Sequence, residues 1–563
     1  MIKRWLKNKI QEYYQDTAFD VLTPPDDKMG DYSINLAFVL AKKNGTSPIE
    51  EGQKIVEKFK ADREFSDRFG EINFVNPGFV NLFLSEKFIQ EQLTKVYKKR
   101  DSYGTSKIGE GKTVIIEYGG TNIAKPMHVG HLRSTIIGDG LANVYEMLGY
   151  KVVRWNYIGD WGTQFGNLIA AYKLWGNEKE LKKKPIQTML NLYVRFHDEL
   201  KNNPDLRSRG REELKKLEEG DAEDRKLWEM FREYSLDEFD KIFQQLDIKF
   251  DITKGESGYE MVIGETVEFI EQKGILKKSE GADIIELEGL PPTLIRKSDG
   301  ASLYITRDIA SLKERIEEYK PEKILYVVAN QQALHFEQLF AVWRMLGFSG
   351  TDLIHVKFGM VLGEDGKKLA TREGKGIPLQ ELIDKIVALA GKVVREKNPK
   401  LSEKEADEIS KAVGIGALKY NDLKQHPRTD IAFDWSAMLD FSGNSGPYLQ
   451  YTYARLSSIL AKAGNRKAGN PALLVEAEEQ RVAKRLLEFP DSVEKCSEFY
   501  SLNGLALYLY ELSNDANRFY ESVRILGDMN IERINARLML IETVAVVLGR
   551  GLKILGIGSL PRI

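Results

Sequence analysis

The chain has 563 residues, 42% of them hydrophobic and 29% charged, so it is long enough for about three or four domains with hydrophobic cores of their own. Its single cysteine, Cys496, excludes a disulfide framework and any cysteine-based zinc site. The 82 Lys and Arg against 84 Asp and Glu argue against a protein that coats nucleic acid through bulk positive charge, but they leave open a nucleic-acid partner held by local contacts.

The first 105 residues are predicted to form a small α+β domain. Their basic opening segment lacks the apolar stretch and cleavage site of a signal peptide, and no apolar run in the chain approaches the ~20 residues that span a bilayer. We therefore expect a cytoplasmic protein that does not enter a membrane. Two short strand patterns, 72–75 and 79–84, flank a turn at Asn76-Pro77-Gly78, and residues 98–111 resemble a linker.

Strand and helix patterns alternate between residues 106 and 445. An apolar strand pattern at 114–116 is followed by a helical pattern that begins near His128, and a second strand pattern covers 152–157. This βαβ arrangement is the repeating unit of a doubly wound parallel sheet of the Rossmann type. Further strand patterns lie at 323–328 and 353–358. Residues 177–257 are highly charged and helical in pattern, and we expect them to be an insertion.

The last part of the chain, residues 446–563, shows only helical patterns, at 449–460, 477–489, 500–519 and 531–548. The sequence therefore predicts a multidomain α/β protein. An α+β N-terminal domain (1–105) precedes a Rossmann-like doubly wound parallel-sheet domain (106–445) with a helical insertion (177–257), and an all-α C-terminal bundle (446–563) follows.

The helix that opens the βαβ unit carries the motif His128-Val129-Gly130-His131. Histidines three residues apart lie on one face of the first turn, and the helix N-terminus offers N–H groups and partial positive charge to an anion such as a triphosphate. Gly130 would let a flat adenine ring approach the backbone. Two histidines making surface hydrogen bonds are the alternative, but the position after the first strand of a βαβ unit favours a binding site.

The motif matches the HIGH signature of class I aminoacyl-tRNA synthetases, and the chain as a whole resembles the arginyl-tRNA synthetase family. The segments that carry this resemblance run almost from end to end. They are Gly30-Asp31-Tyr32-Ser33, Asn76-Pro77-Gly78-Phe79-Val80-Asn81, Asn122-Ile123-Ala124-Lys125-Pro126-Met127 before the histidines, Asn156-Tyr157-Ile158-Gly159-Asp160-Trp161-Gly162, Tyr448-Leu449-Gln450-Tyr451-Thr452-Tyr453-Ala454-Arg455 and Leu560-Pro561-Arg562.

The resemblance implies an arginine–tRNA ligase. Such an enzyme uses ATP with Mg²⁺ to convert L-arginine into arginyl-adenylate, and then transfers the arginyl group to the 3′-terminal adenosine of tRNA(Arg). It also implies that activation requires bound tRNA. We expect a monomer whose partners are tRNA(Arg), L-arginine and ATP. Six histidines and one cysteine show no zinc-ligand spacing, so no protein-bound metal is expected.

For the ATP site, the resemblance implies contacts from His128, Gly130 and His131, with both histidines catalytic. The family's second signature is a lysine-bearing loop, and Lys368 is expected to bind ATP there and stabilise the leaving pyrophosphate. Thr371 stands where that signature usually has its second lysine. The missing cation is expected from Lys125, with Arg372 as the alternative. A solvated basic turn is the other interpretation of this segment.

For the arginine site, the resemblance assigns Glu117 and Asp308 to the guanidinium, Tyr304 to packing against it, and Asn122 and Gln332 to the α-amino group. A guanidinium is a planar fork that pairs with carboxylates and stacks on aromatic rings. Taken alone, Asp308 could equally be a helix-start residue and Glu117 a surface carboxylate at a strand end. The family's serines ahead of Asn122 are replaced here by Gly119-Gly120-Thr121, which puts the positioning of ATP in question.

For the tRNA, the resemblance implies contacts from both ends of the chain. The N-terminal residues Phe79 and Asn81 are expected at the corner of the tRNA. Aromatic and polar side chains that read single-stranded loops are expected in the C-terminal bundle. These are Tyr448, Tyr451, Arg455 and Arg518, and at helical spacing about half of such candidates are expected to belong to the core instead.

Two other functions remain open from the sequence. A different enzyme with the HIGH signature, either another class I synthetase or a small nucleotidylyltransferase, would lack the Tyr304 and Asp308 pair or the helical C-terminal domain. A non-catalytic tRNA-binding relative would be expected to lose the histidines or the lysine loop, and both are present.

Overall fold

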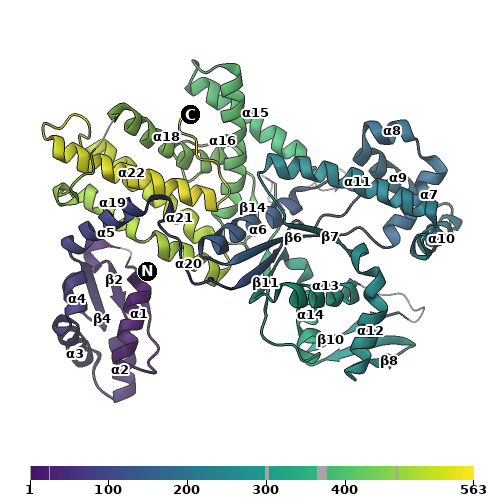
Figure 1. The fold of residues 1–563 in the computed structure, drawn as a ribbon, viewed down its shortest axis with the longest axis horizontal. Coiled ribbons are helices and arrows are strands. Elements are labelled where there is room, and N and C mark those ends of the chain that lie inside the picture. Colours follow the sequence, from purple (N-terminus) through teal and green to yellow (C-terminus); the bar gives the residue numbers. More distant parts are fainter. Residues whose placement is uncertain (1, 25, 298–303, 364–376, 465–466) are drawn as a thin grey trace.

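The computed structural model describes residues 2–24, 26–297, 304–363, 377–464 and 467–563. Figure 1 shows the central sheet, with the N-terminal region and the C-terminal helices on one side of it and two projecting units on the other. This arrangement confirms the predicted fold class of an α+β N-terminal region, a doubly wound parallel sheet and a helical C-terminal region.

The N-terminal region is a four-stranded antiparallel sheet in the order β1-β2-β4-β3, with helices packed around it. Its strands are β1 (Val21–Leu22), β2 (Tyr32–Ile34), β3 (Phe69–Val75) and β4 (Phe79–Leu84), and its helices are α1 (Ile2–Tyr13), η1 (Asp27–Met29), α2 (Leu36–Asn44), α3 (Pro48–Ala61), α4 (Arg63–Arg68) and α5 (Glu86–Lys99). The predicted hairpin at 72–84 is confirmed, because β3 and β4 pair across the turn. The expected linker is partly helical, since α5 runs to Lys99 and is followed by η2 (Arg100–Ser102).

The central sheet is parallel throughout and has the order β12-β11-β5-β6-β7. Its strands are β5 (Thr113–Glu117), β6 (Lys151–Ile158), β7 (Ile252–Gly255), β11 (Lys323–Ala329) and β12 (Asp352–Phe358). Helix α6 (Val129–Met147) connects β5 to β6, as the sequence predicts. The order reverses between β5 and β11, and in such sheets ligands bind beyond the carboxyl ends of the strands at this switch point.

Alternating residues of β5 pack into two different cores. Val114 and Ile116 join the large core that includes α6 and the C-terminal helices, whereas Ile115 joins a second core. That second core contains residues of α12 (Ile263–Gln272), α13 (Tyr304–Tyr319) and α14 (Ala333–Met345). The period-2 alternation of a strand thus buries both faces of the sheet, which explains the continuous apolar run at 114–116.

The helices of the insertion begin and end earlier than the range 177–257 expected for it. The helices are α7 (Thr163–Trp175), α8 (Glu178–Lys183), α9 (Pro185–Glu199), α10 (Asp205–Glu219) and α11 (Ala222–Gln245). The next element, β7, lies inside that range but pairs in parallel with β6 as the edge strand of the sheet. Strand β7 was missed because its residues, Ile-Thr-Lys-Gly, are mostly polar and include a glycine.

A second unit beside the sheet was also missed by the sequence analysis. It contains η3 (Glu256–Val262), α12 and a small antiparallel sheet of β8 (Lys277–Ser279), β9 (Ala282–Leu287) and β10 (Leu290–Arg296). Strand β8 is fully exposed, and β10 begins Leu-Pro-Pro, a pattern that argues against a strand. After β11 come η4 (Asn330–Gln332) and α14, and β12 is followed by β13 (Val361–Leu362), which pairs with β14 (Ile431–Ala432).

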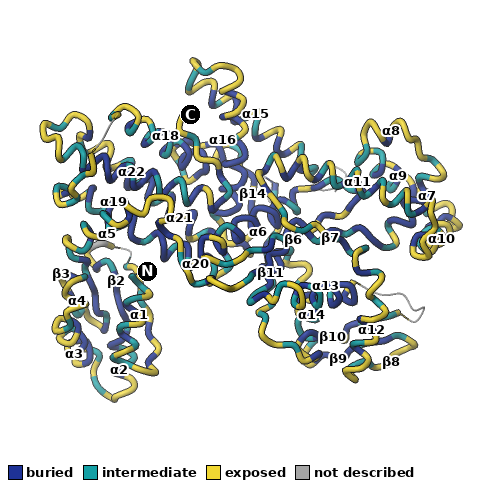
Figure 2. The backbone as a smooth tube through the Cα atoms, in the orientation of Figure 1, coloured by how far each residue is buried: buried dark blue, intermediate teal, exposed yellow. Residues whose placement is uncertain are grey.

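The C-terminal part is helical wherever it is described beyond β14. Helices α15 (Leu379–Lys397) and α16 (Glu403–Leu423) precede β14, and α17 (Trp435–Met438), α18 (Gly446–Ala463), η5 (Pro471–Leu473), α19 (Ala477–Leu487), α20 (Phe489–Phe499), α21 (Asn503–Ser522) and α22 (Ile531–Ile554) follow it. The predicted helix at 477–489 is interrupted near Glu488, and Pro490 lies in the first turn of α20, where proline is tolerated. Buried backbone runs from the sheet through α6 into α20 and α21 (Figure 2).

No helix in the described ranges is both long enough and apolar enough to cross a membrane.

Candidate active site

Two adjoining pockets lie at the carboxyl ends of β5, β11 and β12, where the strand order reverses. The first pocket has a volume of about 440 Å³ and is lined by residues 119–120, 128–131, 133–134, 327–332 without Asn330, and 358–361. The second has a volume of about 350 Å³ and lies on the side of α13. Gly120, Val328 and Gln332 line both pockets, so a ligand in one pocket can meet a ligand in the other.

The first pocket is built around the start of α6. His128 caps this helix, and its ring Nδ1 accepts a hydrogen bond from the backbone N–H of Gly130 at 3.1 Å. The ring Nδ1 of His131 accepts from the backbone N–H of His128, also at 3.1 Å. Because each Nδ1 is an acceptor, a neutral ring carries its proton on Nε2.

His131 is held in the neutral form. Burial, with a smaller contribution from the nearby His128, lowers the pKa of His131 to about 3. Gly130 makes the arrangement possible, because a Cβ at this position would come within 2.9 Å of Cε1 in the His128 ring. The pocket therefore offers imidazole N–H donors next to the positive end of a helix, a combination that suits a phosphate group.

Of the three cations expected beside this pocket, the structure describes only Lys125. Lys125 lies 4.8 Å from the centre of the Tyr193 ring of α9, and it lines neither pocket. Burial lowers the pKa of Lys125. Lys368 and Arg372 lie outside the described residues.

The second pocket brings together all five residues that were predicted to bind arginine. Glu117 is the last residue of β5, Asn122 follows the loop after β5, and Gln332 ends η4. Tyr304 and Asp308 lie one turn apart at the start of α13. Residues that are nearly 220 positions apart in the chain thus meet at the carboxyl edge of the sheet.

Two of the carboxylates in the second pocket already have an internal partner. Glu117 Oε2 lies 2.6 Å from a guanidinium nitrogen of Arg315, and Asp308 Oδ2 lies 2.6 Å from Nε2 of His335. Burial alone would lower the pKa of His335, but the hydrogen bond that it donates to Asp308 and the charge of that carboxylate raise it above the ordinary value. Arg315 and His335 were not among the predicted site residues.

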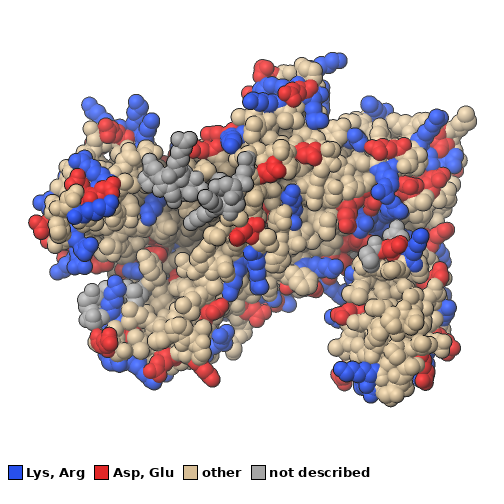
Figure 3. Space-filling view, turned by 180° about the vertical axis from the view of Figure 1, so that it is seen from behind, with Lys and Arg blue, Asp and Glu red and all other residues tan. Residues whose placement is uncertain are grey.

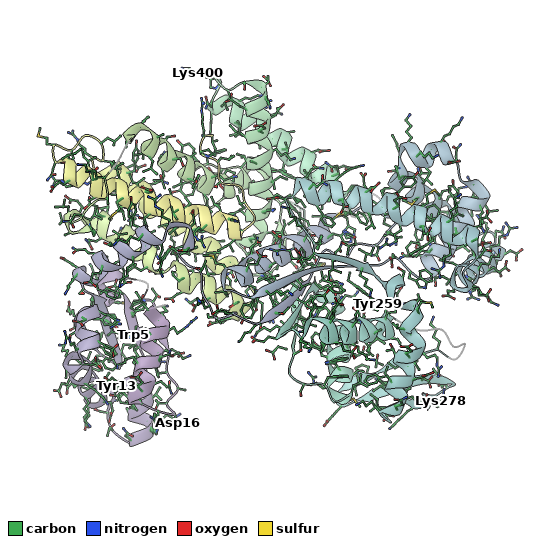
Figure 4. The ribbon with its side chains drawn as sticks, in the orientation of Figure 1. Trp5, Tyr13, Asp16, Tyr259, Lys278 and Lys400 are labelled. Atoms are coloured by element: carbon green, nitrogen blue, oxygen red, sulfur yellow. The ribbon has the colours of Figure 1, made fainter. Side chains whose placement is uncertain are left out.

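A third carboxylate, Glu256, was also missed. It begins η3 directly after β7 and lines the second pocket, and its Oε2 is buried without a hydrogen-bond partner among the described residues. Burial raises the pKa of Glu256 to about 8. The tyrosines Tyr157 and Tyr326 line the same pocket, and Tyr259, which contacts the Tyr157 ring, lies between β7 and α13 (Figure 4). Carboxylates surrounded by aromatic rings suit a planar cation.

The loop Gly119-Gly120-Thr121 joins the two pockets. Both glycines have positive φ, 87° and 54°, a backbone conformation that other residues adopt with strain. The Gly119 N–H donates to Ser134 Oγ, which in turn donates to the carbonyl of Val327, so the loop is tied to α6 and β11. The family's serines would not fit this backbone without strain, and the glycines are therefore matched to the local conformation.

Within the described residues, no group of three or more His, Cys, Asp or Glu side chains is arranged to hold a metal ion.

Comparison with known proteins identifies the family to which the chain belongs. Its residues 92–435 match the family described as tRNA synthetases class I (R), catalytic domain. Residues 1–84 match the arginyl tRNA synthetase N-terminal domain, and residues 449–563 match the DALR anticodon binding domain. The chain belongs to the arginyl-tRNA synthetase family.

Individual relatives of this synthetase family match nearly the whole chain. The arginine–tRNA ligase of Ligilactobacillus salivarius is 42% identical over 99% of this chain and 97% of its own length. The crystal structure of arginyl-tRNA synthetase from Plasmodium falciparum superimposes with a TM-score of 0.84 at 28% identity, covering 100% of this chain and 98% of that one. Arginyl-tRNA synthetase from Thermus thermophilus has the same fold, with a TM-score of 0.85 at 24% identity and complete coverage of both chains.

In and directly before the region that matches the family's anticodon binding domain, residues 449–563, the candidate side chains differ in exposure. Tyr448 is 9% exposed, and its hydroxyl donates to Asn514 and accepts from Asn517, so it faces the interior of the bundle. Arg455 lies 4.9 Å from the centre of the Tyr451 ring, and both side chains are partly exposed. Arg518 is exposed on α21.

In the region that matches the family's N-terminal domain, Asn81 is only 5% exposed and accepts a hydrogen bond from Ser33 Oγ at 2.7 Å. This bond joins β2 to β4, so the placement of Asn81 favours a role inside the sheet over contact with RNA. Phe79 is half-buried, and its ring packs edge-on against Phe38 at 5.2 Å.

Proposed function

We propose that this chain activates L-arginine with ATP and transfers the arginyl group to the 3′-terminal adenosine of tRNA(Arg). The observation that carries this proposal is the pair of adjoining pockets, one lined by two histidines at a helix N-terminus and the other by three acidic side chains. The printed names of its relatives, which are arginine–tRNA ligases at about 40% identity, support the same activity.

In the activation step, a carboxylate oxygen of arginine attacks the α-phosphorus of ATP, and pyrophosphate leaves. Magnesium enters with ATP as part of the substrate. His128, Gly130 and His131 would bind the triphosphate, because all three line the first pocket at the start of α6. Lys125, Lys368 and Arg372 remain the proposed cations for the leaving group. Holding the two substrates in adjoining pockets supplies much of the acceleration.

Selection of arginine is proposed to depend on Asp308 and Glu117, which would accept hydrogen bonds from the guanidinium, with Glu256 as a further carboxylate. Tyr304 would pack against the guanidinium, and Asn122 and Gln332 would hold the α-amino group. Lysine and ornithine lack the fork and would leave buried carboxylates unpaired, which a site of this kind rejects strongly.

Binding of tRNA is proposed to use the regions before and after a catalytic region of residues 106–445. Lys and Arg are intermixed with Asp and Glu on the face shown in Figure 3, and the net charge of the chain is −2. We therefore propose that a few placed side chains, Phe79, Tyr451, Arg455 and Arg518 among them, hold the tRNA. We further propose that the enzyme acts as a monomer in the cytoplasm.

The test of this function is pyrophosphate exchange with arginine, lysine and ornithine, each with and without tRNA(Arg). We expect exchange with arginine only, and only when the tRNA is present. Failure of arginine to support exchange in the presence of tRNA would refute the function. Exchange with arginine in the absence of tRNA would refute only the proposed dependence on tRNA.

Replacing His131 with Ala should lower kcat/KM for ATP by about 100-fold, because it removes an Nε2–H donor from the first pocket. The dissociation constant of the tRNA should stay within twofold. Exchange kinetics and a filter-binding assay measure the two quantities. His197→Ala on α9, which lines neither pocket, is the control, and an equal loss of activity in both variants would refute the role of His131.

A further inference from the structure

A buried cation lines the pocket that is proposed for a cationic substrate. Helix α13 presents Tyr304, Asp308, Ser311 and Arg315 to the second pocket, at the spacing i, i+4, i+7 and i+11 that places side chains on one helical face. The first two fit a guanidinium ligand. Arg315 carries the same charge as the substrate, so its presence requires an explanation.

The Arg315 side chain cannot turn out of this position into water. It is 1% exposed, and its guanidinium carbon lies 4.4 Å, 5.5 Å and 5.8 Å from the ring centres of Trp155, Tyr157 and Tyr326. These aromatic faces stabilise the cation and fix its plane. Its ion pair is the 2.6 Å contact with Glu117 Oε2.

Glu117 depends on this neighbour for its charge. The Glu117 side chain is 10% exposed at the end of β5, and burial raises the pKa of its carboxyl, while Arg315 offsets part of that rise. A neutral carboxyl would be a much weaker partner for a guanidinium than a carboxylate. The contact with Arg315 uses Oε2, not the second oxygen Oε1, and Glu117 lines the pocket.

We propose that Arg315 is a positioning residue for arginine selection, which holds Glu117 ionised and fixes its carboxylate so that one oxygen is left for the substrate. This inference rests on the proposed function. Arg315 acts through Glu117 and need not contact the substrate. Because Oε2 is occupied, Glu117 offers a single acceptor, and the planar guanidinium has to be shared between Glu117 and other carboxylates of the pocket. The single ammonium group of lysine is poorly suited to a site whose acceptor oxygens come from separate side chains.

The experiment compares Arg315→Gln with the unmodified enzyme in tRNA-dependent pyrophosphate exchange between pH 6 and pH 9. At pH 7 we expect the KM for arginine to rise by about 10- to 100-fold, with the KM for ATP unchanged. In the variant, Glu117 has lost the cation that favours its charged form, so the KM for arginine should fall as the pH rises. Arg315→Lys retains the charge and should restore most of the affinity.

Other titratable groups face Glu117 from the elements packed around it. They are Asp308 on α13, His335 on α14, Tyr326 on β11, Tyr157 on β6 and Glu256 on η3. These groups are present in both proteins, so the informative quantity is the difference between the two pH profiles. The double variant Glu117→Gln/Arg315→Gln should abolish that difference, and its KM should be lower than the product of the two single effects predicts.

The matched control is Arg537→Gln, which breaks another buried Arg–Glu pair, with Glu479 at 2.6 Å in the C-terminal helices. It should lower the unfolding temperature but leave the KM for arginine unchanged.

The inference is overturned if Arg315→Gln raises the KM for ATP as much as that for arginine, or if the pH profiles coincide. If Arg315→Gln does not fold, Arg315→Lys serves alone: a few-fold rise in the KM for arginine with the KM for ATP unchanged supports the inference, and a KM for ATP raised as much as that for arginine overturns it. Failure of the unmodified enzyme to exchange would instead refute the proposed function.

Discussion

Replacing Asp308 with Asn should lower kcat/KM for arginine by about 100- to 1000-fold, since the loss of a buried charged partner costs a bound cation this much affinity. Asp308 lines the second pocket, and its Oδ2 is held at 2.6 Å by His335, so its carboxylate is fixed before any substrate arrives. Asparagine has the same shape but only one oxygen and no charge. The measurement is tRNA-dependent pyrophosphate exchange at several concentrations of arginine.

The same substitution should change His335 in a measurable direction. The hydrogen bond and the charge of Asp308 raise the pKa of His335 against the opposing effect of burial, so Asp308→Asn should lower the pKa of His335. Titration of the imidazole signals by NMR measures this shift. Glu318→Gln, near the far end of α13 and outside the second pocket, is the matched control for the removal of one carboxylate. A loss of less than tenfold in Asp308→Asn would contradict the assignment of Asp308 to the guanidinium.

The sequence indicated which side chains meet in the second pocket, but not which residues of the protein pair with the acidic side chains there. Glu117, Asn122, Tyr304, Asp308 and Gln332 all line the pocket, and their roles in binding arginine stay predictions. Their internal partners Arg315 and His335 were missed, because an ion pair between distant elements leaves no local pattern. A signal for Arg315 was nevertheless present, since it lies seven residues after Asp308 and therefore on the same face of α13.

The limits of the fold prediction have a similar physical origin. Strands β5, β6, β11 and β12 were predicted because burial on both faces makes them apolar. Strand β7 lies at the edge of the sheet and needs few apolar residues. Its sequence therefore could not be distinguished from the charged, helical pattern that precedes it. Among the proposed tRNA contacts, Tyr448 and Asn81 are buried and bonded within the protein. Helical or strand spacing alone could not separate these side chains from the exposed ones.

The start of α6 is tied to the C-terminal half of the chain through one buried arginine. Arg133 is fully buried, and its Nε lies 3.1 Å from Asp422 Oδ2 on α16. Its two terminal nitrogens donate to the carbonyls of Thr429 and Pro427 at 2.9 Å and 3.1 Å. The Pro427 carbonyl also accepts from the N–H of Gly359, at the end of β12. Arg133 thus fixes the helix that carries the histidines against the segment that supports the opposite wall of the first pocket.

Replacing Arg133 with Gln should therefore destabilise the protein by about 3–5 kcal/mol, because it leaves the carboxylate of Asp422 buried without its cation. Burial raises the pKa of Asp422 even in the presence of Arg133, so the variant should respond by binding a proton at this site, and its stability deficit should shrink as the pH falls. Urea denaturation between pH 5 and pH 8 measures the loss. Lys182→Gln, which breaks an exposed pair with Glu178 on α8, should leave the denaturation midpoint unchanged. Equal midpoints for both variants would show that Arg133 does not stabilise the junction between α6 and α16.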